Sequence, residues 1–376
     1  MTALLKFFAK FDNLQTMSKK IIVNGVAYCI QNITGVERVA IDMMSALDEF
    51  AQKGEMEIVL PKNAKSVPTF KNITVTLLDK NFESITKWEQ WDFQNYVRKQ
   101  KGIPLDFCNS MPYYVPGIVY LHDIYCKLHP NNYKSLYEKI VRSYTCRLYR
   151  RIAKKALKIV TVSNFSKDTI VDVYKIDPER IVVINNGISP NYTATKADKN
   201  ILNKFPELKK RPFYFMLGAL SERKNLKWVL RHAKLYPDDF FAISGTSISD
   251  NECSILDSLK ALKNVLMLGY LSDAETKALM EKCKAFIFPS FFEGFGMPPL
   301  EALNCGAKII ISNAAALPQI YKNTAYYIDP EDPNTDLDEL LEKKVDSPKI
   351  LIDKLTSQNA AIQLYSVIKE VCQKYS

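Results

Sequence analysis

The sequence predicts an α/β protein made of two doubly wound domains, each a parallel sheet with helices on both faces. Three observations support this prediction. The 376 residues exceed the length of one ordinary domain. Short β-branched runs alternate with helical segments through both halves of the chain, and the runs are apolar throughout, as strands buried on both faces are. Hydrophobic residues make up 47% and charged residues 24% of the chain, a balance that excludes wholesale disorder.

Eleven short apolar runs are expected to form the strands. In the first half these are residues 21–23, 57–60, 118–121, 159–162 and 181–184. In the second half they are residues 213–217, 240–244, 265–268, 285–289, 308–311 and 325–328. Helical spacing of apolar residues predicts helices at 35–52, 164–174, 225–236, 273–283, 299–305 and 349–374.

The domain boundary is expected in the polar, proline-punctuated segment 189–212. The predicted parts are a leader at 1–18, a first domain at 19–195, a second domain at 196–350 and a C-terminal helix at 351–376. That last helix can pack back on the first domain. Ligands of parallel-sheet domains gather at the carboxyl ends of the strands, so the expected site is a cleft between the two domains.

The net charge of +10 belongs to the first half of the chain. Residues 1–199 carry 29 Lys and Arg against 19 Asp and Glu, whereas residues 200–376 carry 22 of each sign. The first domain is therefore expected to face an anionic partner, a membrane surface or a nucleic acid. The basic stretch contains no recognisable nucleic-acid module, so nucleic acid is the last choice.

The densest basic stretch, 134–158, holds nine basic side chains and the single acid Glu138. Apolar residues recur along it at helical spacing: Leu136, Ile140, Val141, Tyr144, Leu148, Ile152 and Leu157. Such a helix can lie on anionic lipid, at ~1 kcal/mol per basic side chain near the surface. It can equally be a domain helix with a solvated outer face, and both interpretations stay open.

Residues 1–18 form a second amphipathic segment, without the small-residue cleavage site of a secretory signal. It is interpreted either as a helix that touches a membrane or docks on the chain itself, or as a plain leader, with Met17 as another possible start. The eight cysteines form no CxxC pair, which is typical of reduced thiols and not of a zinc site. With only three histidines, a multi-histidine metal centre is not expected.

The most informative segment is 290–311, SFFEGFGMPPLEALNCGAKIII, which lies between two predicted strands. Its loop holds Glu293, Gly294 and Gly296, and its helix is expected to begin at Pro298–Pro299 and to place Glu301 in the first turn. Glycine amides and the helix dipole favour an anion there, and a carboxylate can accept hydrogen bonds from sugar hydroxyls. Taken alone, an acid that merely complements the helix dipole explains Glu301 as well.

The whole segment resembles the donor site of the retaining family-4 glycosyltransferases, which have the GT-B fold. Glu293 and Glu301 match the two glutamates of their E-x7-E signature, and Gly294, Phe295, Gly296 and Met297 match the donor-binding loop between them. The resemblance extends from about Lys19 to Pro330. It implies two Rossmann-like domains that face each other across a cleft.

Other segments match in the order that the family implies. At 216–230 the family clamps the donor pyrophosphate with a basic pair. Lys224 matches its lysine, Gly218 its glycine, and Arg223 stands beside the lysine, while Ala219 replaces the usual arginine. The segment 269–275 resembles the one that lies along the nucleotide base, with Tyr270 and Leu271 in the base pocket.

In the first domain, Gly35 matches a family glycine loop near the donor, although many members carry two adjacent glycines there. His122 and Asp123 end the strand at 118–121, where the family keeps a histidine that contacts the transferred sugar. Asn186 and Gly187 match a segment that flanks the cleft. The segment 162–167 matches as well, and both segments also have a plain structural interpretation, as an N-cap at Ser163 and as a glycine turn at Gly187.

The resemblance implies a metal-independent retaining transferase that moves a hexosyl unit from a nucleotide-diphosphate sugar, with no cofactor. Arg223, Lys224 and the amides near Gly296 would stabilise the leaving phosphate, while Glu293 and His122 would contact the sugar. The acceptor would be lipid-linked or a polysaccharide in bacterial surface-glycan assembly, as for mannosyl- and rhamnosyltransferases. The enzyme would be cytoplasmic and peripheral on the inner face of the cell membrane. A catalytically inactive transferase-like partner protein and a sugar-nucleotide epimerase are the alternatives.

Overall fold

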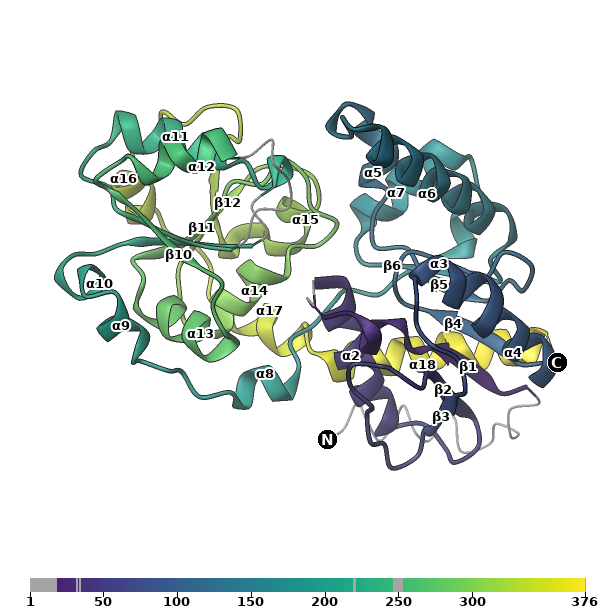
Figure 1. Cartoon of the computed structure of the whole chain (residues 1–376). Helices are drawn as coiled ribbons and strands as arrows, with labels where there is room; N and C mark the ends of the chain where they lie inside the picture. Colours follow the sequence, from purple (N-terminus) through teal and green to yellow (C-terminus); the bar gives the residue numbers. More distant parts are fainter. Residues whose placement is uncertain (1–18, 32, 34, 219–220, 246–252, 376) are drawn as a thin grey trace. The chain divides into compact units, whose positions relative to one another are not determined.

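Two parallel β-sheets organise the chain in the computed structural model (Figure 1). The structure describes residues 19–375 except 32, 34, 219–220 and 246–252. The predicted leader 1–18 therefore lies outside the described residues, and so does Ala219, which stands where the family usually has an arginine. The chain divides into two units, of which unit 1 is 1–120, 148–159 and 361–376, and unit 2 is 121–147 and 160–360.

The first sheet has the strand order β3-β2-β1-β4-β5-β6-β7. Its strands are β1 (Ile21–Asn24), β2 (Met56–Pro61), β3 (Thr74–Leu78), β4 (Ile103–Asp106), β5 (Ile118–Tyr120), β6 (Lys158–Thr161) and β7 (Ile181–Val183). Residues of β1, β2 and β4 are buried throughout, which confirms the expectation of strands with two covered faces.

The second sheet has the order β10-β9-β8-β11-β12-β13. Its strands are β8 (Tyr214–Leu217), β9 (Phe241–Ser244), β10 (Val265–Gly269), β11 (Ala285–Phe288), β12 (Ile309–Ser312) and β13 (Tyr326–Ile328). All its strand pairs are parallel. The order reverses between β8 and β11, the place at which open parallel sheets bind ligands.

The longer helices lie close to their predicted positions. They are α2 (Gly35–Asp48), α6 (Leu136–Lys155), α7 (Asn164–Tyr174), α11 (Leu226–Leu235), α13 (Asp273–Lys282) and α14 (Met297–Asn304). Shorter helices are α3 (Ile85–Lys87), α4 (Gln94–Gln100), α5 (Tyr125–Leu128), α8 (Pro190–Ala194), α9 (Ile201–Lys204), α10 (Glu207–Lys210), α12 (Cys253–Lys260), α15 (Leu317–Tyr321) and α16 (Leu337–Glu342). None of the described helices is long and apolar enough to span a bilayer.

The predicted helix at 349–374 is two helices, α17 (Lys349–Lys354) and α18 (Ser357–Lys374). The break forms because Ile188 pairs with the intervening backbone: its amide donates to Leu355 O over 3.0 Å, and its carbonyl accepts from Ser357 N. In unit 1, α18 is fastened by a buried acid, since Tyr365 Oη donates to Glu55 Oε2 over 2.7 Å and Lys369 forms an ion pair with Glu55.

Candidate functional site

Two loops of the second half lie next to each other at one edge of its sheet. The loop after β8 contains Gly218 and a 3-10 turn at Glu222–Lys224, and the loop after β11 ends at Gly296. Because β8 and β11 are parallel neighbours, with Tyr214 opposite Ala285, their carboxyl ends lie side by side. The sheet thus brings together two segments that are about 70 residues apart in sequence.

A buried ion pair joins these loops. Lys224 Nζ donates to Glu293 Oε1 over 2.7 Å, and the two side chains are 8% and 7% exposed. Burial lowers the pKa of Lys224, against the opposing attraction of Glu293. Burial alone would raise the pKa of Glu293, but the charges of Lys224 and Arg223 hold it below its usual range. Glu293 is therefore an ionised carboxylate at neutral pH.

Arg223 provides a second cation beside this pair. Its guanidinium lies 3.6 Å from Asp123 Oδ2 and 5.5 Å from the centre of the Tyr125 ring. The charge of Glu293, and then that of Asp123, raises the pKa of Arg223. The Phe291 amide donates to Arg223 O over 2.9 Å, which fixes the backbone of the turn against the second loop.

His122 and Asp123 lie against the same loop. A Cβ atom on Gly294 would be 2.8 Å from His122 O, 3.2 Å from Asp123 Cβ and 3.3 Å from Ser166 Oγ. Such distances leave no room for a side chain, so glycine is required here by close approach. His122 is buried, with 6% of its surface exposed. The structure thus places His122, Asp123, Arg223, Lys224, Glu293 and Gly294 in one neighbourhood.

The helix after the loop begins earlier than predicted. Its first residue is Met297, with Pro298 in the first turn, and Gly296 precedes it at φ 88°. Glu301 is therefore in the second turn and not in the first, which corrects the prediction. Its side chain is buried, and its charge contributes, after burial, to the raised pKa of Tyr192 and Tyr321. Tyr321 Oη donates to Gly296 O and so holds the start of the helix.

The other predicted site residues differ in exposure and packing. Tyr270 is 81% exposed, while Leu271 and Phe295 are buried in the core of the second half, against which Met297 also packs. Gly187 is packed on Thr356, whose carbonyl carbon would lie 2.2 Å from an added Cβ. The absence of a side chain at Gly187 therefore lets the backbone at 355–357 pass close to it. Asn186 is buried beside it.

Gly35 is the first residue of α2 in unit 1, and an added Cβ would meet nothing within 4 Å. Gly218 has a positive φ of 146° and lies against the stem of Lys224, since an added Cβ would be 3.5 Å from Lys224 Cε. Gly218 therefore lies close to the lysine of the ion pair.

An aromatic cluster that the sequence pattern did not predict lies beside Arg223. The Tyr125 and His129 rings stack at 4.5 Å, and Phe292 lies 5.4 Å from each of them. Phe165 meets Phe292 edge to face at 5.5 Å. The available signal was the place of Phe292 directly before Glu293 in the motif. The cluster supports the loop that carries Glu293.

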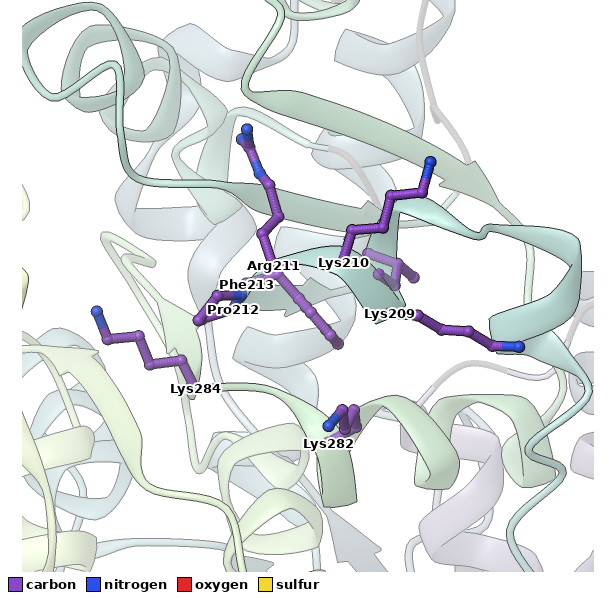
Figure 2. A pocket seen from close by; sticks show the side chains of 8 residues that line it. Lys209, Lys210, Arg211, Pro212, Phe213, Lys282 and Lys284 are labelled. Carbon is purple, nitrogen blue, oxygen red and sulfur yellow. The ribbon is translucent and has the colours of Figure 1, made fainter.

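A pocket lies away from these residues, before the first residues of β8 and β11 (Figure 2). Basic side chains surround it: Lys209, Lys210, Arg211, Lys282 and Lys284. Figure 2 shows that they spread apart, with Lys209 and Lys284 pointing to opposite sides. Lys284 also forms an ion pair with Asp338, and Arg211 lies over the Phe240 ring. The pocket assembles no convergent anion site.

Among the described residues, no group of three His, Cys, Asp or Glu side chains could hold a metal ion.

Two family models match the chain. The model described as glycosyl transferases group 1 matches residues 198–358, and the model described as glycosyltransferase family 4 matches residues 33–192. The two matches follow one another and together include His122, Arg223, Lys224, Glu293 and Glu301.

Curated relatives include bacterial glycosyltransferases. The chain is 29% identical over 216 residues to the O-antigen chain mannosyltransferase RfbU of Salmonella typhimurium, 56% of each chain. It is 28% identical over 183 residues to the O-antigen chain mannosyltransferase B of Escherichia coli, 46% of this chain and 48% of that one. An Escherichia coli UDP-Gal:alpha-D-GlcNAc-diphosphoundecaprenol alpha-1,3-galactosyltransferase is 27% identical over 232 residues, 58% of this chain and 59% of that one. The chain thus spans about half the length of the curated relatives it matches.

Solved structures share the fold over nearly the full length. Sucrose-phosphate synthase from Thermosynechococcus elongatus superposes with a TM-score of 0.67 at 14% identity, covering 95% of this chain and 98% of that one. WaaG, a glycosyltransferase involved in lipopolysaccharide biosynthesis, gives 0.63 at 14% identity and covers 94% and 98%. These likenesses establish two Rossmann-like domains of the GT-B type.

Proposed function

The chain belongs to the glycosyltransferases of group 1 and family 4, and from this premise we propose that it transfers a hexosyl unit from a nucleotide-diphosphate sugar. The observation that carries the proposal is the buried pair of Lys224 and Glu293 with Arg223 beside it. A diphosphate in a closed site needs cations at hydrogen-bonding distance, and a sugar needs an ionised carboxylate for its hydroxyls. Both are present at the carboxyl edge of one sheet.

In the proposed reaction, the bond between the anomeric carbon and the β-phosphate oxygen breaks as the new glycosidic bond forms on the same face of the sugar. The departing phosphate takes the proton of the acceptor hydroxyl, so charge and atoms balance. Arg223, Lys224 and the amides around Gly296 stabilise the charge that develops on this phosphate. The cations of Arg223 and Lys224 offset the negative charge on the departing phosphate, and we propose that the reaction needs no metal or other cofactor.

The remaining roles follow from the family resemblance. Glu293 positions the transferred sugar, Glu301 binds the ribose hydroxyls, and His122 holds a sugar hydroxyl on the acceptor side. Gly218, Tyr270 and Leu271 belong to the donor site, as do Gly35 and the loop from Gly294 to Met297. Asp123, Asn186 and Gly187 border the acceptor. In this proposal the segment 19–195 takes the acceptor and the segment 196–350 takes the donor.

We propose a lipid-linked or polysaccharide acceptor of bacterial surface-glycan assembly. Two relatives are named O-antigen chain mannosyltransferases, and a third is named for a diphosphoundecaprenol acceptor. An acceptor of that kind is anchored in a membrane, and the positive charge of residues 1–199 suits an anionic surface. The proposed location is therefore the inner face of the cell membrane, as a peripheral protein.

Titration calorimetry with UDP, GDP, ADP and dTDP, in the absence of metal ions, tests the donor site. One nucleotide should bind, and Lys224→Ala should weaken it by about 10- to 100-fold, the loss of one charge-assisted hydrogen bond. Lys227→Ala is the matched control, because Lys227 lies three residues away and its side chain is 61% exposed. If no nucleotide binds, the transferase proposal fails and the inactive partner protein becomes the better interpretation.

A further inference from the structure

The apolar stripe of α6 is buried along only part of its length. Its C-terminal members Leu148 and Ile152 are 5% and 0% exposed and belong to the core. Its N-terminal members lie on the surface: Leu136 is 76% exposed, Ile140 59%, Val141 42% and Tyr144 39%, and the neighbouring Tyr137 is 76% exposed. Figure 1 labels this helix beside α5 and α7.

This division separates the two interpretations of the basic segment. A domain helix with a solvated outer face would turn its whole apolar stripe into the core. In α6, five large apolar side chains within three turns are between 39% and 76% exposed. Scattered exposed apolar residues are ordinary, but a contiguous set on one helix indicates a surface that binds something.

The charges around the stripe have one sign. Lys139, Arg147, Arg150, Lys154 and Lys155 are exposed, and none forms an ion pair within the described ranges of the chain. The single acid of the helix, Glu138, is engaged at the helix start, where its Oε2 accepts from the amides of Ser135 and Lys134 over 2.8 and 2.9 Å. No acid on α6 neutralises its cations.

Two further arginines attach the helix to its surroundings. Arg142 Nε donates to Cys126 O over 2.7 Å. Arg151 Nε donates to Tyr113 O over 3.0 Å, and its guanidinium lies 4.6 Å from the centre of the Tyr113 ring. These bonds hold the backbone in place, so the exposed stripe belongs to an ordered helix and is not a frayed end.

We propose that residues 136–147 of α6 insert their apolar side chains into an anionic lipid surface, with the neighbouring cations at the level of the headgroups. Apolar side chains flanked by cations suit such a surface, because the acyl chains can bury the apolar groups and the anionic headgroups can pair with the cations. The proposal deepens the proposed function by naming the segment that docks, and it rests on that function for the membrane-borne acceptor. Its test does not use sugar transfer.

Sedimentation of the full chain with lipid vesicles is the first experiment. The protein should bind vesicles of phosphatidylcholine mixed with phosphatidylglycerol, and bind poorly to phosphatidylcholine alone. The triple variant Leu136→Ser, Tyr137→Ser and Ile140→Ser should bind about tenfold or more weakly. Ile350→Ser is the matched control, because Ile350 is 83% exposed on α17 and should leave binding unchanged. All four positions are exposed, and an unaltered melting temperature shows that folding is intact.

Tryptophan fluorescence then reports insertion itself. Trp91 is 61% exposed, whereas Trp88 and Trp228 are buried, so Trp91→Phe removes the exposed native signal. In that background, Tyr137→Trp should shift to shorter wavelength with anionic vesicles and be quenched by brominated lipid. Ile350→Trp should show neither effect.

Three results would overturn the proposal. Equal vesicle binding by the triple variant and the unaltered chain would place the docking surface elsewhere. Binding without quenching at position 137 would mean that α6 is not inserted. A change of oligomeric state in the triple variant, with vesicle binding retained, would assign the stripe to a second copy of the chain. Nucleotide binding measured by calorimetry is independent of all three, so failure of this proposal is distinguishable from failure of the proposed function.

Discussion

Lys224, in the turn after β8, donates a 2.7 Å hydrogen bond to Glu293, in the loop after the neighbouring strand β11, and both side chains are buried. Removing one member of such a pair leaves a buried charge without its partner. We therefore expect Lys224→Met to lower the free energy of unfolding by about 3–5 kcal/mol. Urea denaturation of the variant and of the unaltered chain measures this difference.

The exposed pair of Lys227 and Glu222, 3.9 Å apart, provides the control. Lys227→Met should change stability by less than about 1 kcal/mol, because solvent screens an exposed pair. The double variant Lys224→Met with Glu293→Gln should regain much of the lost stability, since no unpaired charge remains, yet should not bind nucleotide. Unchanged stability of Lys224→Met would contradict the buried pairing.

Substitutions of His122 and Glu301 are expected to impair different steps, turnover and nucleotide binding respectively. Glu301→Ala should weaken nucleotide binding about tenfold or more, because hydrogen bonds to the ribose are lost. His122→Ala should leave nucleotide binding within about twofold and lower the turnover number, because it acts on the sugar side. Calorimetry and a transfer assay separate the two effects. If both variants bind and turn over normally, the assignment of these residues is wrong.

Gly294 is expected to tolerate no side chain. In Gly294→Ala the new methyl group would lie 2.8 Å from His122 O, so the loop carrying Glu293 must shift away from His122 and Asp123. The variant should lose about 1–3 kcal/mol of stability and most of its activity. Thermal unfolding and a transfer assay measure both.

Gly35→Ala is the matched glycine control for stability, because an added Cβ there meets nothing within 4 Å. It should melt at the temperature of the unaltered chain or above it, since alanine favours the helix that begins there. A loss of activity without a loss of stability in this variant would support the predicted contact of Gly35 with the donor. Equal melting temperatures of Gly294→Ala and the unaltered chain would refute the close approach.

Much of the fold could be predicted because its strands are buried on both faces. Each of the eleven predicted runs overlaps an observed strand, and the apolar character alone identifies them. The two missed strands lack that signal. β3 lies at the sheet edge with exposed positions, and β4 contains Pro104, which usually argues against a central strand.

The site was predictable where its residues form a contiguous motif. Glu293, Gly294 and Gly296 lie in one loop, and the structure brings Lys224 to them as the parallel strand order requires. The partnership of Arg223 with Asp123, and the aromatic support from Tyr125, depend on tertiary packing between distant segments. No spacing in the sequence reports such contacts.

The break between α17 and α18 could not be predicted from the sequence either. The apolar period continues through Leu355, yet the backbone there bonds with Ile188, and Gly187 makes room for that approach. Tertiary hydrogen bonds thus override local helical propensity at this point. The sequence pattern also could not predict which part of α6 is buried. Its apolar residues are of the same types in the buried part and in the exposed part.

Glu89 should make the stability of unit 1 depend on pH. Its carboxyl is 1% exposed, and burial raises its pKa to about 7, although Ser110 Oγ donates to it. The folded chain therefore keeps a proton that the unfolded chain releases near pH 4.5, so stability should fall as pH rises towards 7. Glu89→Gln, which still accepts from Ser110, should be more stable than the unaltered chain at pH 8 by about 1–3 kcal/mol and equal to it at pH 4. Urea denaturation across this range measures the difference, with Glu83→Gln, 59% exposed, as the control. Parallel pH curves for Glu89→Gln and the unaltered chain would mean that Glu89 is ionised in the folded protein.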